Sequence, residues 1–261
     1  MKNFNFKSAS NAKEAAKLAS GRATFLAGGM SLLPAMKLRL AAYSDLINIK
    51  KIKTLSGIKV SSKSLRIGAT TTHASVASSK EVGKSIPSLA VLADGIGDPQ
   101  VRNRGTIGGS IANNDPAADY PSACLALNAT IHTSKRKISA DKFFKGMFET
   151  YLKKGELIES IEFEVPEKSG YAKFPNPASR YAVVGVYVAK LKNGVRVAVT
   201  GAASCVFRSK ELENALSSNF SNSAIDNTDI SNKGLNSDIH ASAEYRAHII
   251  KVMAKKAVSS C

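Results

Sequence analysis

Short apolar runs alternate with polar turns over the N-terminal third of the chain, and the spacing of the apolar positions predicts small helices and strands. Alanines and Leu18 recur at helical spacing within Ser10–Ala19, which predicts a short helix. A brief strand is predicted over Ala23–Ala27, and it runs directly into Gly28-Gly29. The other elements predicted here are a helix Leu32–Leu38 capped by Ser31, a strand Asp45–Ile49, a hairpin of Ile58–Val60 and Leu65–Ala69, a helix Ala74–Ser79 capped by Thr72, and a helix Pro87–Gly95.

The segment Ile96–Pro121 has the densest turn chemistry of the chain, with glycine, proline, asparagine and aspartate throughout. A structureless stretch of this length inside a compact domain is usually either functional or disordered. Because apolar residues recur within it and no charge run interrupts it, we predict an ordered, functional loop. A short helix capped by Asp119 and a strand over Leu125–Ile131 are predicted to follow.

The C-terminal part reads as strands followed by a helix. Its predicted elements are a strand Ile158–Val165, a linker Glu167–Asn176, strands Tyr181–Leu191 and Val195–Phe207 joined by a turn at Lys192–Gly194, and a helix Ser242–Val258 with Tyr245, Ile249, Val252 and Met253 on one face. The linker divides the chain near residue 168, so we predict two domains, 1–168 and 169–261.

Composition adds a charge question to this picture. The 261 residues carry a formal net charge of +17, and such an excess attracts polyanions. The lysines are scattered, however, and no stretch interleaves basic with aromatic residues as single-strand binders do. A lysine-rich solvated surface is therefore the default interpretation, and a basic nucleic-acid-binding module remains an alternative.

Neither a membrane span nor a secretory signal is visible, since no apolar run reaches about 18 residues and Met1–Ser10 lacks an apolar core. We therefore expect a soluble, cytoplasmic protein. The three cysteines, Cys124, Cys205 and Cys261, have no CxxC spacing. No histidine has a metal-site or nucleophile-motif context, so we expect no metal site and no redox centre built from cysteines.

Two paired-glycine turns are the most informative local feature. Gly28-Gly29 lies between a predicted strand and a helix start, and Gly108-Gly109 follows Thr106 in the turn-rich segment. Glycines let backbone N–H groups approach a ligand closely, and phosphate is the usual occupant of such a turn. Because neither turn fits the GxGxxG fingerprint or a phosphate-binding P-loop, two such turns favour a dinucleotide clamped at its pyrophosphate, though each alone reads as an ordinary turn.

Charged residues near the second turn leave alternatives open. Asp115 and Asp119 could act as general acid and base, but a helix cap and ordinary turn chemistry explain them better. A fixed carboxylate could also accept hydrogen bonds from a ligand's ribose or ring nitrogens. Arg102 and Arg104 could neutralise phosphate, or pair with Asp98 or solvent.

Four motifs spread over nearly the whole chain carry a family resemblance. They are AGGMSLLPAMKLRL (Ala27–Leu40), IGATTTH (Ile67–His73), IGDPQVRNRGTIGGSIANNDPAADYP (Ile96–Pro121) and SDIHASAEYRAHIIKVMAKKAV (Ser237–Val258). They closely resemble the FAD-binding medium subunit of molybdenum hydroxylases, nearest to the medium subunit of aerobic carbon monoxide dehydrogenase.

The resemblance implies an α+β fold, with a PCMH-type FAD-binding domain of two α+β subdomains. A small α/β C-terminal domain of the carbon monoxide dehydrogenase flavoprotein type would follow. It also implies non-covalent FAD, an iron–sulphur small subunit and a molybdenum large subunit as partners, and a dimer of heterotrimers. In this family electrons pass from molybdenum through the clusters to FAD and then to an external acceptor, so the absence of cysteine ligands here is consistent with that division of labour.

Matching positions imply the cofactor-binding residues. One set should hold the FAD pyrophosphate from one side: Ala27, Gly28, Gly29, Met30, Ser31 and Leu32. A second set should hold it from the other: Thr106, Ile107, Gly108, Gly109 and Ser110. Asp119 matches a carboxylate near the flavin, Ile158 a hydrophobic cofactor contact and Tyr181 an aromatic residue against the isoalloxazine ring. No residue of the chain is expected to be catalytic, and a stand-alone flavin oxidase is the alternative from the same cofactor.

Overall fold

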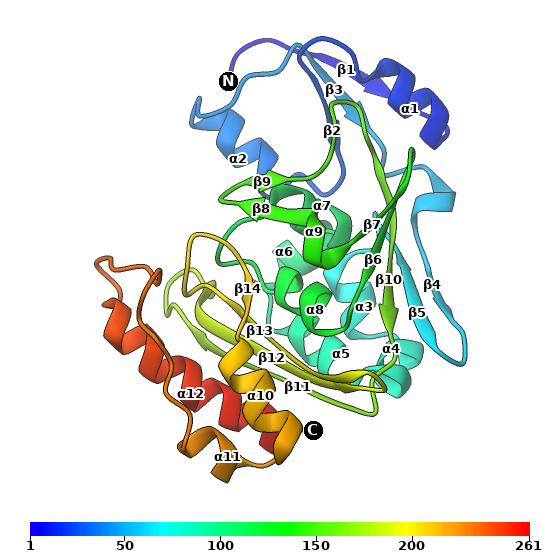
Figure 1. Ribbon diagram of the computed structural model, residues 1–261. Coiled ribbons are helices and arrows are strands. Elements are labelled where there is room, and N and C mark those ends of the chain that lie inside the picture. The colour runs from blue at the N-terminus through cyan, green and yellow to red at the C-terminus, as the bar shows by residue number, and fades with distance from the viewer.

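The computed structural model describes residues 1–261 and shows three units of helix and strand that follow one another along the long axis (Figure 1). The N-terminal unit has a parallel sheet of order β1–β3–β2. Its elements are β1 (Asn5–Ser8), α1 (Ala12–Leu18), β2 (Ala23–Leu26), α2 (Leu32–Lys37), β3 (Asp45–Asn48) and a 3-10 turn, Lys53–Leu55. The helices and strands predicted in this part are confirmed. The Asn11 side chain accepts from the Glu14 amide and thereby starts α1.

The middle unit is built on an antiparallel sheet of order β4–β5–β10–β6–β7 with helices packed on one face. Its strands are β4 (Ile58–Val60), β5 (Ser64–Gly68), β6 (Thr130–Thr133), β7 (Lys137–Ser139) and β10 (Ile158–Glu164). Its helices are α3 (His73–Ala77), α4 (Lys80–Ser85), α5 (Pro87–Asp94), α6 (Pro99–Arg104), α7 (Ile107–Asn113), α8 (Tyr120–Ala126) and α9 (Ala140–Phe143). A small hairpin of β8 (Phe144–Gly146) and β9 (Glu149–Thr150) joins them.

The prediction of a loop over Ile96–Pro121 is wrong, because this segment contains the helices α6 and α7. Side-chain caps explain how so turn-rich a sequence becomes helical: Asp98 accepts from the Val101 amide, and Thr106 accepts from the Gly109 amide. Asn114 then ends α7 in the left-handed conformation, at φ 45°. The strand predicted over Leu125–Ile131 is also shorter than expected. Its first residues complete α8, which is buried on every side, and β6 begins only at Thr130.

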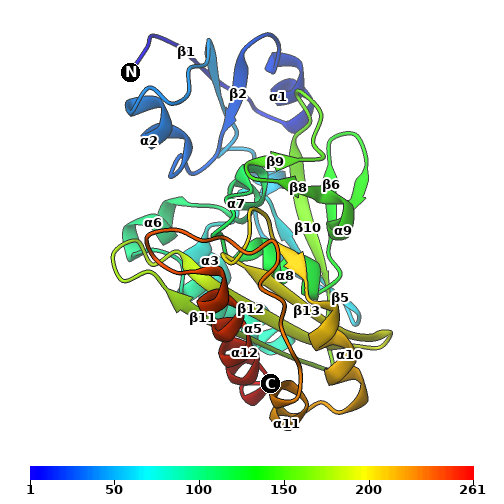
Figure 2. The same ribbon diagram turned by 60° about the vertical axis from the view of Figure 1, so that its left-hand side comes forward.

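The C-terminal unit has an antiparallel sheet of order β11–β12–β13–β14 with α10, α11 and α12 on one face (Figure 2). Its elements are β11 (Lys168–Pro175), β12 (Ala182–Leu191), β13 (Gly194–Thr200), β14 (Phe207–Arg208), α10 (Lys210–Ser218), α11 (Asn222–Asp226) and α12 (Ala243–Ser259). The two faces of the sheet belong to different cores. Val184, Val186 and Val188 pack against the C-terminal helices, whereas Tyr187 and Ala189 join the core of the middle unit.

The predicted linker Glu167–Asn176 is wrong, because β11 occupies nearly all of it. This strand lies at the edge of the sheet and pairs with β12 along its whole length, with its two ends exposed and its centre buried. Gly170 is needed there for packing rather than for flexibility, since a Cβ would overlap the Ala257 carbonyl of α12 and lie 2.6 Å from the Ser260 Oγ. The strand predicted over Val195–Phe207 is also too long, because β13 ends at Thr200.

The final helix is confirmed, but its buried face is only partly as predicted. Ile249 and Met253 are buried, whereas Tyr245 is largely exposed. Arg246 is buried in its place, and its Nη1 donates to the Val183 and Gly201 carbonyls at 2.6 and 3.1 Å. Two carbonyl acceptors and Asp238 pair with both Nη atoms of a guanidinium that hydrophobic periodicity alone would place at the surface, while its buried Nε has no partner.

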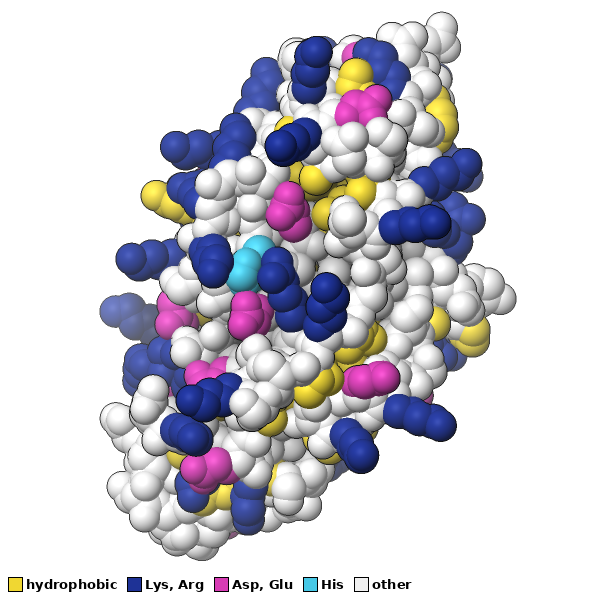
Figure 3. Space-filling model, turned by 90° about the vertical axis from the view of Figure 1, so that its right-hand side faces the viewer, with side chains coloured by type: hydrophobic (Ala, Val, Ile, Leu, Met, Phe, Trp, Pro, Cys, Tyr) yellow, Lys and Arg dark blue, Asp and Glu magenta, His cyan; other side chains and the backbone are white.

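Charge is spread over the surface rather than collected in one stripe. On the face shown in Figure 3, lysine and arginine side chains are distributed from end to end, with acidic groups between them. No helix of the chain combines the length and the apolar character that a membrane crossing requires.

Candidate functional site

The first corner, Ala27–Leu32, connects β2 to α2 and contains a row of unused backbone donors. Six consecutive amides, from Ala27 to Leu32, donate to no acceptor in the protein. Gly29 has φ +78°, a conformation that favours glycine. Ser31 was predicted to cap α2, but its side chain makes no cap hydrogen bond, so this hydroxyl is also free. A turn that turns this many donors away from the protein suits an anion.

The second corner, Thr106–Ser110, begins α7, and its amides are used differently. The Ile107 and Gly108 amides donate to the Thr71 and Ala69 carbonyls at 3.1 and 2.9 Å. The remaining two amides, of Gly109 and Ser110, donate to the Thr106 side chain and carbonyl. The second corner therefore has only the Thr106 amide and the Ser110 hydroxyl free for a ligand, together with the exposed backbone of Gly109.

Backbone contacts bring the two corners together. A Cβ on Gly28 would overlap the Arg104 carbonyl and lie 2.9 Å from the Gly105 Cα. The first corner therefore lies directly against the residues that precede Thr106. Arg104 is exposed, and its guanidinium has no acceptor in the protein. The other nearby arginine, Arg102, instead donates to the Ile96 and Gly97 carbonyls and faces Asp94.

His73 lies beneath this contact, and sequence reasoning assigned it no role. A Cβ on Gly105 would come within 2.6 Å of the His73 Nε2, so the ring and the backbone are tightly packed. Burial, with a smaller contribution from Arg102, lowers the pKa of His73 to about 4, so the imidazole is neutral. Its ring centroid lies 5.4 Å from that of Tyr120, and neither the His73 Nδ1 nor the Tyr120 hydroxyl has a partner. In the sequence, the only indication of a role for His73 was its position at the end of the IGATTTH motif.

Asp119 forms a buried cluster with two residues that the sequence placed in a linker. Its carboxylate accepts from the Tyr171 hydroxyl and lies 3.1 Å from the Lys173 Nζ. Burial raises the pKa of Asp119, and Lys173 and Tyr171 oppose that rise. The prediction that Asp119 caps the helix α8 is wrong, because its carboxylate makes no cap hydrogen bond and bonds to β11 instead. Tyr171 and Lys173 are two positions apart and lie on one face of β11. Sequence reasoning could have paired them with Asp119 only if it had predicted this strand.

The last two predicted site residues lie in different surroundings. Ile158 is buried in β10, and the next residue, Glu159, accepts from the Ala69 amide, whose own carbonyl holds Gly108. Tyr181 is 46% exposed at the turn between β11 and β12. The residue after it, Ala182, donates its amide to the Ala117 carbonyl, two residues before Asp119, and partial burial, then Asp115 and Asp119, raise the pKa of the Tyr181 hydroxyl. Asp115 itself closes a turn by accepting from the Ala117 amide.

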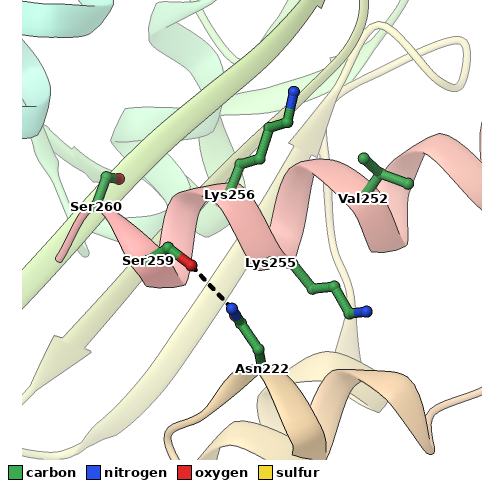
Figure 4. Close-up of a pocket in the computed structure, with 6 residues that line it drawn as sticks. All are labelled: Asn222, Val252, Lys255, Lys256, Ser259 and Ser260. Carbon is green, nitrogen blue, oxygen red and sulfur yellow. Dashed lines mark hydrogen bonds between the residues drawn. The ribbon is translucent and has the colours of Figure 1, made fainter.

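Other concave surfaces lie away from these residues. A shallow hollow of about 570 Å³ lies between α11 and α12, where Asn222 donates to Ser259 and the Lys255 and Lys256 side chains point apart (Figure 4). Lys255 pairs with Asp226, so one of its two cations is already neutralised. No group of three histidine, cysteine or acidic side chains is arranged to hold a metal ion.

Comparison with known proteins identifies the family to which the chain belongs. Residues 2–167 match the model of the FAD binding domain in molybdopterin dehydrogenase. The glyceraldehyde dehydrogenase medium chain of Sulfolobus acidocaldarius is 36% identical and covers 97% of this chain and 96% of its own. The carbon monoxide dehydrogenase medium chain of Hydrogenophaga pseudoflava is 38% identical over 71% of this chain and 69% of its own.

The solved structures agree with the sequence relatives. A structure of carbon monoxide dehydrogenase from Hydrogenophaga pseudoflava superposes with a TM-score of 0.89 at 32% identity, over 99% of this chain and 97% of that one. The expected α+β architecture of a PCMH-type FAD domain is thus confirmed, as is the resemblance drawn from the four motifs. The chain belongs to the family of FAD-binding medium subunits of molybdenum hydroxylases.

Proposed function

We propose that this chain binds FAD non-covalently between its two glycine corners and relays electrons within a molybdenum hydroxylase complex. The observation that carries the proposal is the row of six free amides from Ala27 to Leu32, packed against the second corner. Free backbone amides in a glycine turn before a helix bind a diphosphate without any side-chain charge. The exposed Arg104 guanidinium beside them adds an opposite charge.

The second corner holds the same diphosphate from the other side. Thr106 contributes its amide and Ser110 its hydroxyl, while the Ile107 and Gly108 amides fix the corner to the segment that follows β5. Gly109 lets the ligand approach, because its backbone is exposed and has no side chain. Met30, Ser31 and Leu32 complete the first corner, and the Ser31 hydroxyl is a further donor.

At the flavin end we place Asp119, Tyr181 and Ile158. Asp119 is held by Tyr171 and Lys173, so its carboxylate is fixed before any ligand arrives. Tyr181 presents its ring at the surface, where it stacks on the planar ring of the ligand, and the next residue is bonded to the Ala117 carbonyl near Asp119. Ile158 supports the site from the interior, through the strand that contacts the second corner.

Bound FAD would supply the redox chemistry, so the chain needs no acid or base of its own. Its residues position the cofactor, shield it and tune its potential. We place substrate oxidation in a molybdenum large subunit and the intermediate carriers in an iron–sulphur small subunit, assembled as a dimer of heterotrimers in the cytoplasm. The relatives' names support this, since they are medium chains of dehydrogenases that act on glyceraldehyde and on carbon monoxide.

We also propose a domain boundary near residue 168, between an FAD-binding domain (1–168) and a C-terminal domain (169–261). The start of β11 at Lys168 and the family match over residues 2–167 support it. The two parts share a core through Tyr171, Tyr187 and Ala189, so they dock tightly.

The test is to incubate the purified chain with FAD, remove free cofactor and record the absorption spectrum. We expect one FAD per chain, released on denaturation, and a shifted flavin midpoint potential in Tyr181→Ala. A colourless chain after reconstitution would overturn the proposal. Oxidation of a small substrate by the chain alone would favour the stand-alone flavin oxidase instead.

A further inference from the structure

A second concave surface, away from the glycine corners, is lined mainly by cations. This basic hollow, of about 560 Å³, is formed by Arg136, Lys137, Ile138, Ser139, Lys142, Lys145 and Tyr151. No acidic residue lines it, and none of its three lysines forms an ion pair. The hollow therefore gathers three lysines without an acidic partner on one concave surface.

Arg136 is held in place at the hollow rather than free in solvent. Its Nε and Nη2 donate to the two Glu156 carboxylate oxygens at 3.0 and 3.1 Å, and Nη2 also donates to the Tyr151 carbonyl. The Glu156 side chain is fully buried and is held in turn by Thr133 and the Lys153 amide. Burial alone would raise its pKa, but these hydrogen bonds lower it to about 2, so the pair stays ionised.

Tyr151 brings two of the cations together. The Arg136 guanidinium carbon lies 4.6 Å from the centre of the Tyr151 ring, and the Lys145 Nζ lies 5.0 Å from it. Contacts of this kind fix the position of a cation over an aromatic face. Since the conformational entropy of these side chains is already lost, a partner would bind them at a lower cost.

An exposed apolar turn borders the hollow. Met147 and Phe148, which we name the hairpin tip, connect β8 to β9 and are 56% and 58% exposed. Phe148 has φ 56°, a conformation that a bulky residue rarely adopts. The Phe148 amide donates to the Asn114 carbonyl, and the Asn114 side chain donates to Gly146 and Glu149.

A strained turn that is pinned on both sides and still displays two apolar side chains is unlike an ordinary solvated loop. Tyrosine, methionine, phenylalanine and arginine are also the residues enriched in protein interfaces. Asn114 is the C-terminal cap of α7, so the hairpin tip is attached to the helix that carries the second corner. Both ribbon views place this hairpin beside α7 (Figures 1 and 2).

We propose that the basic hollow and the hairpin tip form a docking surface for a partner subunit, which presents acidic side chains around an apolar contact. The inference rests on the proposed function only in that the chain works inside a complex. Charge complementarity selects the partner, and the apolar tip excludes water at the centre of the contact.

The experiment co-expresses this chain with the iron–sulphur and molybdenum subunits of its own complex and measures assembly by size-exclusion chromatography on dilution. In Lys142→Glu/Lys145→Glu we expect at least tenfold weaker assembly at low salt, with FAD content unchanged. Phe148→Asn, which tolerates positive φ, should also weaken assembly. Wild-type assembly should weaken as salt rises, because exposed charges are screened over about 10 Å at 0.1 M.

The matched control is Lys50→Glu/Lys51→Glu, which makes the same change in net charge at two exposed lysines of the N-terminal unit. It should assemble as the wild type does. Equal loss in the control, or unchanged assembly in the hollow variants, would overturn the inference. So would binding of a DNA duplex that the hollow variants lose while assembly persists. A wild-type chain that assembles but takes up no FAD would contradict the proposed function and leave the docking surface supported.

Discussion

At Gly28-Gly29 six amides in a row have no acceptor, whereas at Gly108-Gly109 every amide from Ile107 to Ser110 has one inside the protein. Gly28-Gly29 precede α2, whereas Gly108-Gly109 lie in the first turn of α7. In the first corner, Gly28 lets the backbone approach Arg104 closely, and the amides stay without an acceptor. In the second, Gly108 lets α7 pack on the segment that follows β5, since a Cβ there would lie 2.5 Å from the Ala69 Cβ. Paired glycines thus leave the backbone donors unused at one corner, whereas at the other the donors bond within the protein.

The largest effect expected from this difference is on folding. Gly108→Ala forces a methyl group into the backbone of Ala69, so the free energy of unfolding should fall by about 3 kcal/mol. Urea denaturation of the FAD-free chain measures it. Gly83→Ala is the control, because nothing lies within 4 Å of its Cβ in α4, and it should raise stability by about 0.5–1 kcal/mol. Equal stability of Gly108→Ala and the wild type would show that Gly108 is not needed for packing against Ala69.

The next effect concerns cofactor binding at the first corner. Gly29→Ala places a side chain at φ +78° and brings its Cβ within 2.9 Å of Leu33. The amide row should tilt, and the FAD dissociation constant should rise about 30-fold, or roughly 2 kcal/mol. Gly21→Ala has a similar φ, +59°, with open space around it, and therefore controls for backbone strain. Flavin fluorescence titration compares them, and equal FAD affinities would show that the first corner does not hold the cofactor.

The smallest effect is a pH dependence at His73. Its folded pKa, about 4, lies below the ordinary 6.5, so the unfolded chain binds the proton more readily below about pH 6.5. The stability that depends on neutral His73 is complete above pH 6.5 and is lost as the pH falls towards 4. Between pH 7 and 5.5 the loss should be about 1 kcal/mol, and it should be absent in His73→Gln. Identical pH profiles for variant and wild type would mean that this ring does not support the second corner through burial.

Much of the fold follows from local sequence, and the failures have physical causes. The strands β2 and β3, the β4–β5 hairpin and the final helix were predicted because periodicity and caps such as Thr72 act within a few residues, whereas the edge strand β1 was not predicted. The strand β11 was missed because its polar composition suits an edge strand, which is defined only by its pairing with β12. The helices α6 and α7 were missed because the glycines after α6 and within α7 are required by residues distant in the sequence: Gly105 packs against the His73 ring and Gly108 against Ala69.

The candidate site divides in the same way. The glycine corners and Asp119 are visible in the sequence, whereas Tyr171, Lys173 and His73 become site residues only through contacts across the fold. The use of each amide could not be predicted either. The amides of a glycine turn are free for a ligand only where no carbonyl of the protein accepts from them, and at the second corner the Ala69 and Thr71 carbonyls do.

The Asp119 cluster is assembled from both sides of residue 168. The carboxylate comes from the matched FAD-binding stretch, and its ammonium and phenol partners come from the first strand beyond it. A truncated chain ending before Lys168 would lose both the counter-ion of this carboxylate and the sheet that shields it from solvent. Attempts to engineer a minimal flavoprotein from this subunit should therefore retain the C-terminal sheet, because it completes the pocket chemically as well as covering it.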